Sequence, residues 1–307
     1  MVPIEADRPT ARTLVNRETT VHIAVLGMGQ MGHALAERLL ESGHDLTVWN
    51  RTPHKADDLV ARGVSEARTP TRAAAGAEAI FTSLADDSAV LAVVTGPEGV
   101  AAGLAGGVLC DASTVSPQTT AQLHEAVRGR MLASPILGSP AAVISGDASY
   151  LIGGPREHYD RLRPAYDALA DDERRRYLGD DPTVPTTLKL LANYLLMSGI
   201  ATLTEVVVVA QTVGLPDDLI RDFFGRLPLV APGLYNRLDS IVAGEREGWF
   251  SMRLGAKDVR LADALARSHG IQLPLAGSVK RLYERATAEG WAEADIAAVR
   301  EAIRAAR

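Results

Sequence analysis

The stretch HIAVLGMGQMG at residues 22–32 decides how the first half of this chain folds. HIAVL is a short apolar run typical of a buried strand, and residues 31–42 have the apolar spacing of a helix. Gly27, Gly29 and Gly32 lie at the junction in a G-x-G-x-x-G pattern. Because it follows a predicted strand and opens a predicted helix, this pattern indicates a dinucleotide-binding site.

Each glycine has its own task in such a site. The first makes a tight turn, the second lets the backbone approach a pyrophosphate, and the third lets helix and strand pack closely. The start of the helix adds free N–H groups and a partial positive charge for the phosphates. We expect Gln30, Met31 and Leu84 to contact the cofactor as well. The alternative is a glycine-rich turn that binds nothing.

The end of the second predicted strand, about twenty residues beyond the glycines, indicates which cofactor fits. An NAD site usually has Asp or Glu here, bound to the ribose 2′-hydroxyl. This chain has Asn50, Arg51 and Thr52 instead. A guanidinium pairs with a 2′-phosphate and stacks on adenine, and the amide and hydroxyl groups can add hydrogen bonds. The sequence therefore predicts NADP(H) rather than NAD(H), with a plain surface arginine as the alternative.

Short apolar runs alternate with helical segments from Val21 to about Gly154, within a domain that is expected to span residues 21–184. This alternation predicts an α/β fold, a Rossmann-type doubly wound and mostly parallel sheet that binds NADP. The runs interpreted as strands are HIAVLG, DLTVWN, AEAIFTSL, GVLCDAS, MLASPIL and ASYLIGG. The stretch DDERRRYLGDDP at 171–182 is expected to be a turn. Residues 1–20 are expected to be a flexible tail, because they lack the apolar core of a signal peptide.

Residues 185–307 contain no convincing strand and are expected to form an all-α domain for dimerisation and substrate binding. The predicted helices cover 185–214, 217–226, 231–243, 251–269, 274–289 and 293–306. The first would be about 45 Å long and is apolar on nearly every side. A domain of this size cannot cover such a helix alone, so we expect a homodimer formed through 185–214. Several polar residues in the same run, such as Gln211, argue against a membrane span.

Composition excludes several classes of partner. A net charge of -6 and a pI near 5.7 argue against a nucleic-acid-binding surface. The single cysteine, Cys110, excludes an internal disulfide and a cysteine-based zinc cluster, and it fits a reducing cytosol. The seven histidines show no metal-ligand spacing. We expect a cytoplasmic protein without a metal site, whose partner is a small-molecule substrate.

Five ordered blocks are together far more specific than the glycine motif alone. They are GMGQMG through WNRTPHKA, DASTVSP at 111–117, SPILGSPAAVISG at 134–146, LKLLAN at 188–193 and AKDVRLA at 256–262. With these blocks, over about residues 21 to 300, the chain resembles the β-hydroxyacid dehydrogenases, with the imine reductases as close relatives. The resemblance implies a Rossmann domain followed by a helical domain that pairs two subunits.

The fourth block carries the expected catalytic residues. Lys189 and Asn193 are four residues apart and so share one face of a helix. The resemblance makes Lys189 the general acid and Asn193 its companion. Hydride delivered to a carbonyl carbon leaves negative charge on oxygen, which a positioned ammonium can stabilise and protonate. The alternative is a lysine that reaches solvent beside a satisfied buried amide.

The second and fifth blocks carry further expected site residues. The resemblance implies that Ser113 and Thr114 lie near the nicotinamide and the substrate. It also implies that Lys257, which precedes Asp258, reaches back towards the cofactor. Without the resemblance, the two hydroxyls would cap a helix that begins near Pro117, and the lysine would be solvated on an amphipathic helix.

The third block departs from the family pattern. Leu137, Gly138 and Ser139 replace the usual Ser-Gly-Gly that holds a substrate carboxylate. Leu137 and the segment YLGDD, which is similar to one in imine reductases, favour an apolar or imine substrate, whereas Lys189 and KDVRLA favour the dehydrogenase pattern. We therefore expect an NADPH-dependent oxidoreductase that transfers hydride to a small carbonyl or imine. The alternatives are a dedicated imine reductase with another proton donor and a catalytically silent NADPH-binding protein.

Overall fold

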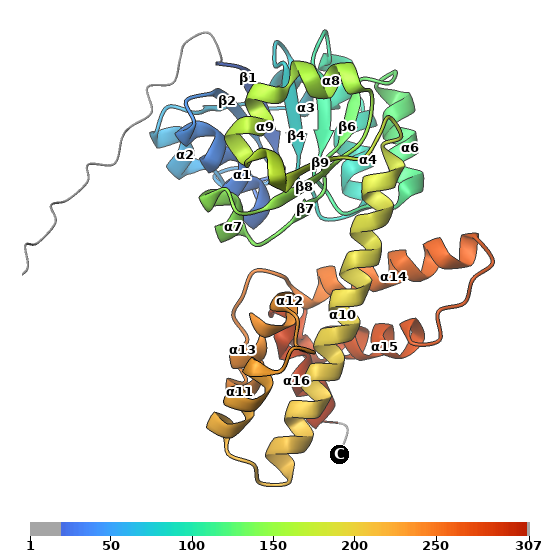
Figure 1. The fold of residues 1–307 in the computed structure, drawn as a ribbon. Helices are drawn as coiled ribbons and strands as arrows, with labels where there is room; N and C mark the ends of the chain where they lie inside the picture. Colours follow the sequence, from blue (N-terminus) through green and yellow to red (C-terminus); the bar gives the residue numbers. More distant parts are fainter. Residues whose placement is uncertain (1–19, 306–307) are drawn as a thin grey trace, which may run out of the picture.

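The computed structural model describes residues 20–305, which form two parts joined by one long helix (Figure 1). The first part has a six-stranded sheet with helices around it, and the second is built from helices. The fold class predicted from the sequence is therefore confirmed. The expected tail at residues 1–20 lies, apart from Thr20, outside the described residues.

A parallel sheet forms the centre of the first part. Its strands are β1 (His22–Leu26), β2 (Asp45–Trp49), β3 (Ser65–Glu66), β4 (Ala79–Thr82), β5 (Val108–Asp111) and β6 (Met131–Ala133). Their order is β3-β2-β1-β4-β5-β6, and every neighbouring pair is parallel. The strand order reverses between β1 and β4, and ligands of such sheets bind beyond the carboxyl ends of the strands at this reversal.

Helices cover both faces of the sheet. They are α1 (Gln30–Glu41), α2 (Asp57–Ala61), α3 (Pro70–Ala74), α4 (Asp87–Thr95), α5 (Val100–Gly103), α6 (Pro117–Ala126), α7 (Pro140–Ser145), α8 (Arg156–Arg161) and α9 (Arg163–Leu169). Successive strand residues point to opposite faces. Thus Ile23 and Val25 join a core with α1, α2 and α9, whereas Ala24 and Leu26 join a core with α3 to α6.

Two of the predicted strand regions do not follow the expectation. β7 (Ile136–Leu137) pairs antiparallel with β8 (Ser149–Ile152), and β8 pairs parallel with β9 (Arg175–Tyr177), in a separate three-stranded sheet. The run MLASPIL was expected to be one strand, but it divides into β6 and β7 at Pro135, which has no N–H for a ladder. The expectation of a turn at 171–182 was also wrong, because that stretch contains a 3-10 turn, η2 (Asp172–Arg174), and β9.

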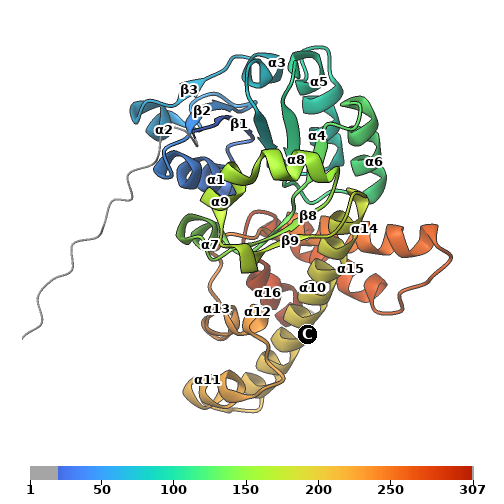
Figure 2. The same cartoon turned by 45° about the horizontal axis from the view of Figure 1, so that its top comes forward.

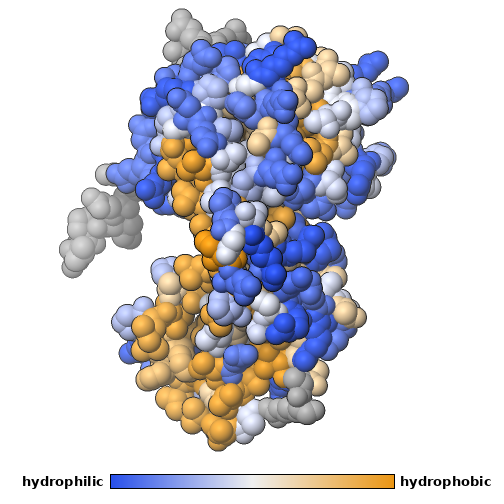
Figure 3. Space-filling model, turned by 90° about the vertical axis from the view of Figure 1, so that its right-hand side faces the viewer, coloured by the Kyte–Doolittle hydropathy of each residue, from blue (hydrophilic) through white to orange (hydrophobic). Residues whose placement is uncertain are grey.

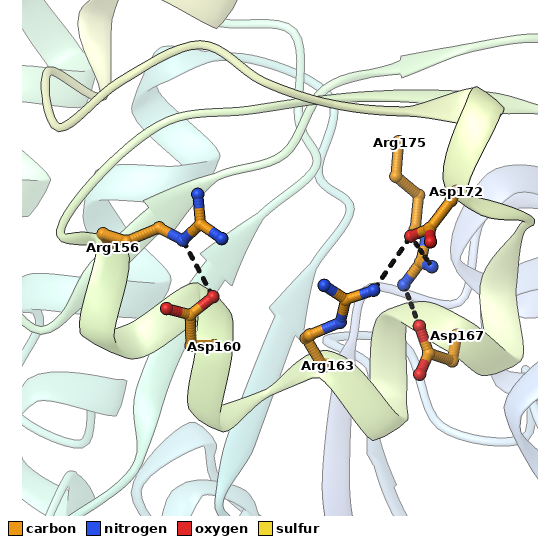
Figure 4. A network of polar contacts seen from close by, with 6 residues as sticks. All are labelled: Arg156, Asp160, Arg163, Asp167, Asp172 and Arg175. Carbon is orange, nitrogen blue, oxygen red and sulfur yellow. Dashed lines mark hydrogen bonds and ion pairs between the residues drawn. The ribbon is translucent and has the colours of Figure 1, made fainter.

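Charged residues conceal β9 in the sequence. The side chain of Arg175 is only 4% exposed and forms ion pairs with both Asp167 and Asp172 (Figure 4). Arg163 also pairs with Asp172, at 3.0 Å. The buried guanidinium and its carboxylate partners therefore attach the strand to α9. Because this contact is made by charged residues, the sequence of β9 shows no apolar pattern that would predict a strand.

The second part consists of α10 (Thr183–Thr212), α11 (Asp217–Arg226), α12 (Pro232–Tyr235), α13 (Leu238–Ala243), α14 (Met252–Ser268), α15 (Ala276–Ala286) and α16 (Val299–Arg304). The predicted helix 231–243 is divided in two at Arg237, whose side chain is bound by Asp295. The predicted helix 274–289 ends in a π-turn, η3 (Thr287–Trp291), and the predicted helix 293–306 begins with a 3-10 turn, η4 (Ile296–Ala298).

The 30-residue α10 belongs to both parts (Figures 1 and 2). Its first turn lies against the sheet part, where the Thr186 and Thr120 hydroxyls are 3.0 Å apart. Farther along, Met197 and Ile200 join a separate core with residues of α13 to α16. Among the described helices α10 alone is long and apolar enough to cross a bilayer, and 44% of its most apolar window is buried within the protein.

Candidate active site

A cleft of about 860 Å³ lies between the two parts. The loops after β1, β2, β4, β5 and β7 line it on one side, and α10 with the segment from residue 233 to 258 lines it on the other. All but one of the residues predicted from the sequence line this cleft: Gly27, Gly29, Gln30, Met31, Asn50, Arg51, Thr52, Leu84, Ser113, Thr114, Leu137, Gly138, Ser139, Lys189, Asn193 and Lys257. The exception is Gly32, which packs behind the cleft wall.

The three glycines after β1 have different surroundings. Gly27 has a φ of 98°, and a Cβ there would lie 2.3 Å from the carbonyl oxygen of Ser83. A Cβ on Gly32 would lie 1.8 Å from the Gly27 oxygen, so only glycine lets α1 approach β1 this closely. A Cβ on Gly29 would meet no atom within 4 Å. Gly29 also precedes α1 without a capping side chain, so the first N–H groups of the helix remain available to an anion.

The loop after β2 holds the residues predicted to select the cofactor. Asn50 accepts a hydrogen bond from the Met28 N–H at 2.9 Å and donates one to the Thr52 carbonyl at 2.8 Å. Asn50 therefore ties this loop to the glycine loop. Arg51 is exposed and makes no hydrogen bond or ion pair with another described residue. Its guanidinium is thus available to an anionic ligand.

A buried carboxylate holds the loop after β5. Asp111 Oδ1 accepts hydrogen bonds from the Thr82 hydroxyl at 2.7 Å and from the Ser113 N–H at 3.1 Å. Burial raises the pKa of Asp111 to about 6. Ser113 Oγ accepts from the Leu84 N–H at 2.9 Å and so joins the loops after β4 and β5. The alternative that Ser113 or its neighbour caps the next helix is wrong, because Ser116 caps α6.

Lys257 of α14 clasps the same two loops from the helical side. Its Nζ donates to the Thr114 carbonyl at 2.6 Å and to the Ala85 carbonyl at 3.1 Å. The same atom lies 3.1 Å from Asp258 Oδ1. The Lys257 side chain is 9% exposed, so it is not a solvated surface lysine.

Asp258 connects this clasp to α10. Its Oδ2 accepts a hydrogen bond from Asn193 Nδ2 at 2.6 Å, and both residues are buried. A carboxylate can only accept, so Asn193 presents its NH₂ group to Asp258 and keeps its own oxygen free to accept from a ligand. Asp258 was not among the predicted site residues, although its position next to Lys257 in a matched block was the available signal.

Lys189 lies one turn before Asn193 on α10. Its Nζ donates to the Ile136 carbonyl at 2.7 Å. Burial lowers the pKa of Lys189 to about 8; Asp258 acts in the opposite direction, and Lys257 adds to the lowering. An amine with this pKa beside a cleft can exchange a proton near neutral pH. The alternative that Lys189 simply reaches solvent does not fit this bond to β7.

β7 and the loop after it form the wall near Lys189. Leu137 is partly exposed and lines the cleft with its apolar side chain. Ser139 Oγ accepts from the Ala142 N–H at 3.1 Å and caps α7. This wall therefore offers an apolar surface where the family pattern has a hydroxyl.

The helical part adds an aromatic wall that was not predicted. Trp249 and Phe250 are stacked, with ring centroids 5.8 Å apart and planes 13° from parallel. The guanidinium of Arg237 lies 4.5 Å from the centroid of the Trp249 ring. All three residues line the cleft. They lie in the breaks before α13 and α14, where no periodic pattern in the sequence marks them.

Two family profiles match consecutive parts of this chain. Residues 22–179 match the NAD binding domain of 6-phosphogluconate dehydrogenase. Residues 185–303 match the NAD-binding region of NADP-dependent 3-hydroxyisobutyrate dehydrogenase. The chain belongs to the β-hydroxyacid dehydrogenase superfamily. This protein is therefore an NAD(P)-dependent oxidoreductase, in agreement with the resemblance noted in the sequence.

Individual relatives agree with this family. The uncharacterized oxidoreductase YfjR of Bacillus subtilis is 33% identical over 92% of this chain and 99% of its own length. Glyoxylate/succinic semialdehyde reductase 2 of Arabidopsis thaliana is 30% identical over 94% of this chain and 81% of its own length.

Solved structures show the same fold. The 3-hydroxyisobutyrate dehydrogenase ygbJ of Salmonella typhimurium superposes with a TM-score of 0.84 at 23% identity, over 92% of this chain and 99% of that one. An imine reductase of Streptomyces aurantiacus gives a TM-score of 0.62 at 26% identity, over 93% and 99%. The arrangement of this chain is thus nearer to that dehydrogenase than to that imine reductase.

Proposed function

We propose that this protein is an NADPH-dependent reductase in which hydride reaches the carbonyl carbon of a small substrate and Lys189 protonates the oxygen. The observation that carries the proposal is the position and acidity of Lys189 Nζ. It lies 2.7 Å from the Ile136 carbonyl at the cleft, with a pKa lowered to about 8. Such an amine is protonated at neutral pH and is still acidic enough to release its proton to a developing alkoxide.

The cofactor half of the cleft fits NADP(H). The space beside Gly29 and the uncapped start of α1 suit a pyrophosphate. Arg51 is free to pair with a 2′-phosphate, and Thr52 is exposed next to it. No acidic residue of the sheet part lines the cleft in the described chain, so no carboxylate repels that phosphate. When bound, the nicotinamide would supply the hydride.

The neighbours of Lys189 control its proton. The Ile136 carbonyl fixes Nζ, and Asp258 stabilises the ammonium from a distance. Burial and Lys257 favour release of the proton. Asn193, held by Asp258, has an oxygen left to accept a hydrogen bond from a substrate hydroxyl or from Lys189.

Electrostatics favour a carbonyl over an imine. A protonated Lys189 repels a cationic iminium but attracts a carbonyl oxygen that gains negative charge. Tyr177 of the segment YLGDD does not line the cleft, and its hydroxyl donates to the Gly154 carbonyl at 2.9 Å. Imine reduction with a neutral Lys189 is the second candidate, and the apolar Leu137 is the observation that favours it.

Initial rates of NADPH and NADH oxidation, measured against matched carbonyls and cyclic imines, test this function. We expect turnover of carbonyls with NADPH and its loss in Lys189→Ala, while NADPH binding persists. Arg51→Asp should weaken NADPH binding by about 10-fold or more, or about 1.4 kcal/mol, and leave NADH binding nearly unchanged. Turnover confined to imines, and undiminished in Lys189→Ala, would establish the second candidate instead. Tight NADPH binding without any turnover would indicate a silent binding protein.

We also propose that two copies associate through α10. Leu191, Leu195, Val206, Val209 and Val213 are exposed and return to one face of the helix and its end. We call these five residues the α10 stripe. Figure 3 shows that apolar surface gathers over the helical part, whereas the sheet part is mostly hydrophilic on this face. A second copy would remove this surface from water, as in a two-fold dimer.

A further inference from the structure

The substrate half of the cleft has little unpaired charge. The helical part brings three cations to the cleft besides Lys189, and each is paired with an acid: Arg237 Nε lies 2.9 Å from Asp295 Oδ1, Arg253 Nε lies 3.0 Å from Glu293 Oε1, and Lys257 Nζ lies 3.1 Å from Asp258 Oδ1. Lys189 is the cation left over in this half of the described cleft. A substrate carboxylate would therefore have to pair with the Lys189 ammonium, which the reaction needs beside the carbonyl oxygen.

Trp249 is the member of the aromatic wall that a ligand can touch. Phe250 and Arg237 are buried, whereas Trp249 is partly exposed and lines the cleft. Other residues of this half of the cleft, such as Leu196 and Leu254, add apolar surface. The part of the Trp249 ring that is open to the cleft, together with these aliphatic side chains, can pack against an aromatic or branched alkyl group and remove it from water.

Arg237 holds Trp249 in place and does not offer its own charge to a ligand. Its Nε donates to Asp295, and its Nη1 donates to Asn236 Oδ1 at 3.2 Å. Its guanidinium plane covers the indole at 4.5 Å. An arginine that is both stacked and paired fixes a ring in a way that a flexible lysine cannot.

Asp295 holds the backbone of the same segment. It accepts a hydrogen bond from the Phe250 N–H at 3.2 Å. A Cβ on Gly248 would lie 2.2 Å from Asp295 Oδ2, so the chain passes directly against the carboxylate. The Phe250 carbonyl accepts from the Ile296 N–H at 2.9 Å. The aromatic wall is thus held on both sides of Trp249.

We propose that Trp249 is the specificity-determining residue for a neutral substrate that carries an aromatic or bulky apolar group next to its carbonyl, and that Arg237 is the positioning residue for the indole. This inference rests on the proposed reductase function. It places the carbonyl oxygen at Lys189 and the apolar group against Trp249. Short aldehydes with a carboxylate would leave the exposed part of the indole in contact with water, and their carboxylate would compete with the carbonyl oxygen for Lys189.

Three aldehydes with saturating NADPH test the inference: benzaldehyde, acetaldehyde and glyoxylate. In the wild type we expect benzaldehyde to have the highest kcat/KM. Trp249→Ala should lower kcat/KM for benzaldehyde roughly 10- to 100-fold more than for acetaldehyde, mainly through KM, whereas Trp249→Phe should keep most of the preference. Arg237→Lys keeps the charge beside Asp295 and loses the stacked plane, so it should raise KM for benzaldehyde and leave kcat nearly constant.

Trp291 provides the matched control. Arg246 lies 4.1 Å over its ring, as Arg237 lies over Trp249, but Trp291 does not line the cleft. Trp291→Ala should therefore leave the benzaldehyde preference unchanged. A wild type that prefers glyoxylate, or a Trp249→Ala variant that lowers all three rates equally, would overturn the inference. No NADPH oxidation with any aldehyde or ketone would instead overturn the proposed function.

Discussion

Two ionisable side chains near the cleft, Lys189 in its wall and Asp111 buried beneath the loop after β5, have pKa values that burial shifts in opposite senses. Burial lowers the pKa of Lys189 to about 8 and raises that of Asp111 to about 6, because it disfavours the charged form of each group. Lys189 has a role in the proposed chemistry. Asp111 has a structural one, since it fixes the loop that carries Ser113.

Carbonyl reduction should depend on the protonation of Lys189. We expect kcat/KM to be level below pH 8 and to fall above it, where Lys189 loses its proton, because its pKa is about 8. Oxidation of the product alcohol should rise through the same pH, since the neutral amine is then the base. Lys189→Ala should lower the reduction rate about 10²- to 10⁴-fold. In Lys189→Arg the fall of kcat/KM above pH 8 should disappear, because arginine keeps its proton. A fall that remains in this variant would show that another group titrates there.

Asp111→Asn should change how stability depends on pH. Asp111 has a pKa of about 6 in the fold and an ordinary value of 3.8, so the unfolded chain ionises first as pH rises. Wild-type stability contributed by this group is therefore lost between about pH 4 and pH 6 and stays level above. Asparagine keeps an oxygen for Thr82 and Ser113 but does not titrate. Urea denaturation should show that the free energy of unfolding of the variant rises relative to that of the wild type as the pH increases over that interval. A difference between the two that does not change with pH would contradict the assignment.

At the scale of elements, two glycines of the loop after β1 are expected to serve different purposes: Gly32 allows close packing, and Gly29 leaves space for the cofactor. Gly32→Ala would place a Cβ 1.8 Å from the Gly27 oxygen, so we expect misfolding or a large loss of thermal stability. Gly29→Ala meets no atom within 4 Å, so it should fold normally but weaken NADPH binding by about 10-fold or more, because the methyl group takes space beside the pyrophosphate. Thermal melting and a fluorescence titration with NADPH distinguish the two effects.

Gly106→Ala is the matched control for these two variants. Its Cβ would also meet no atom within 4 Å, and Gly106 does not line the cleft. It should therefore melt and bind NADPH like the wild type. Equal NADPH affinity in Gly29→Ala and Gly106→Ala would show that the open space at Gly29 is not the phosphate site.

Elements with a continuous apolar pattern could be predicted from the sequence, and elements held by charge could not. β1, β2, β4 and β5 follow apolar runs, and the helix pattern between them placed α1 correctly. β9 was missed because its buried residue is Arg175. The same limit applies to the site. Lys189 and Asn193 lie in a recognisable block, whereas Trp249 and Arg237 meet only after several short helices have folded together.

At the scale of the whole molecule, one chain supplies both sides of the cleft. The single side chain of Lys257 donates hydrogen bonds to two loops of the sheet part. The two parts are therefore held together at the site itself. One chain does not, however, cover the whole surface of α10, and part of the helix remains exposed to solvent. Leu195 and Val209 of α10 are 75% and 61% exposed, and Val213, directly after the helix, is 70% exposed. The opposite face of α10 packs in the core of the helical part.

A second copy is the occupant that we propose for the α10 stripe, and charge insertion tests it. Val209→Glu would bury a carboxylate in the interface, so analytical ultracentrifugation at micromolar concentration should show a dimer for the wild type and a monomer for the variant. Val60→Glu places the same charge on an exposed valine of α2 and should leave the dimer intact. A wild type that is already monomeric, or that sediments with lipid vesicles through α10, would show that another surface covers the stripe. Because Asn193 and Lys189 lie on the same helix, heating a monomeric variant should unfold the region around these residues at a lower temperature than the sheet.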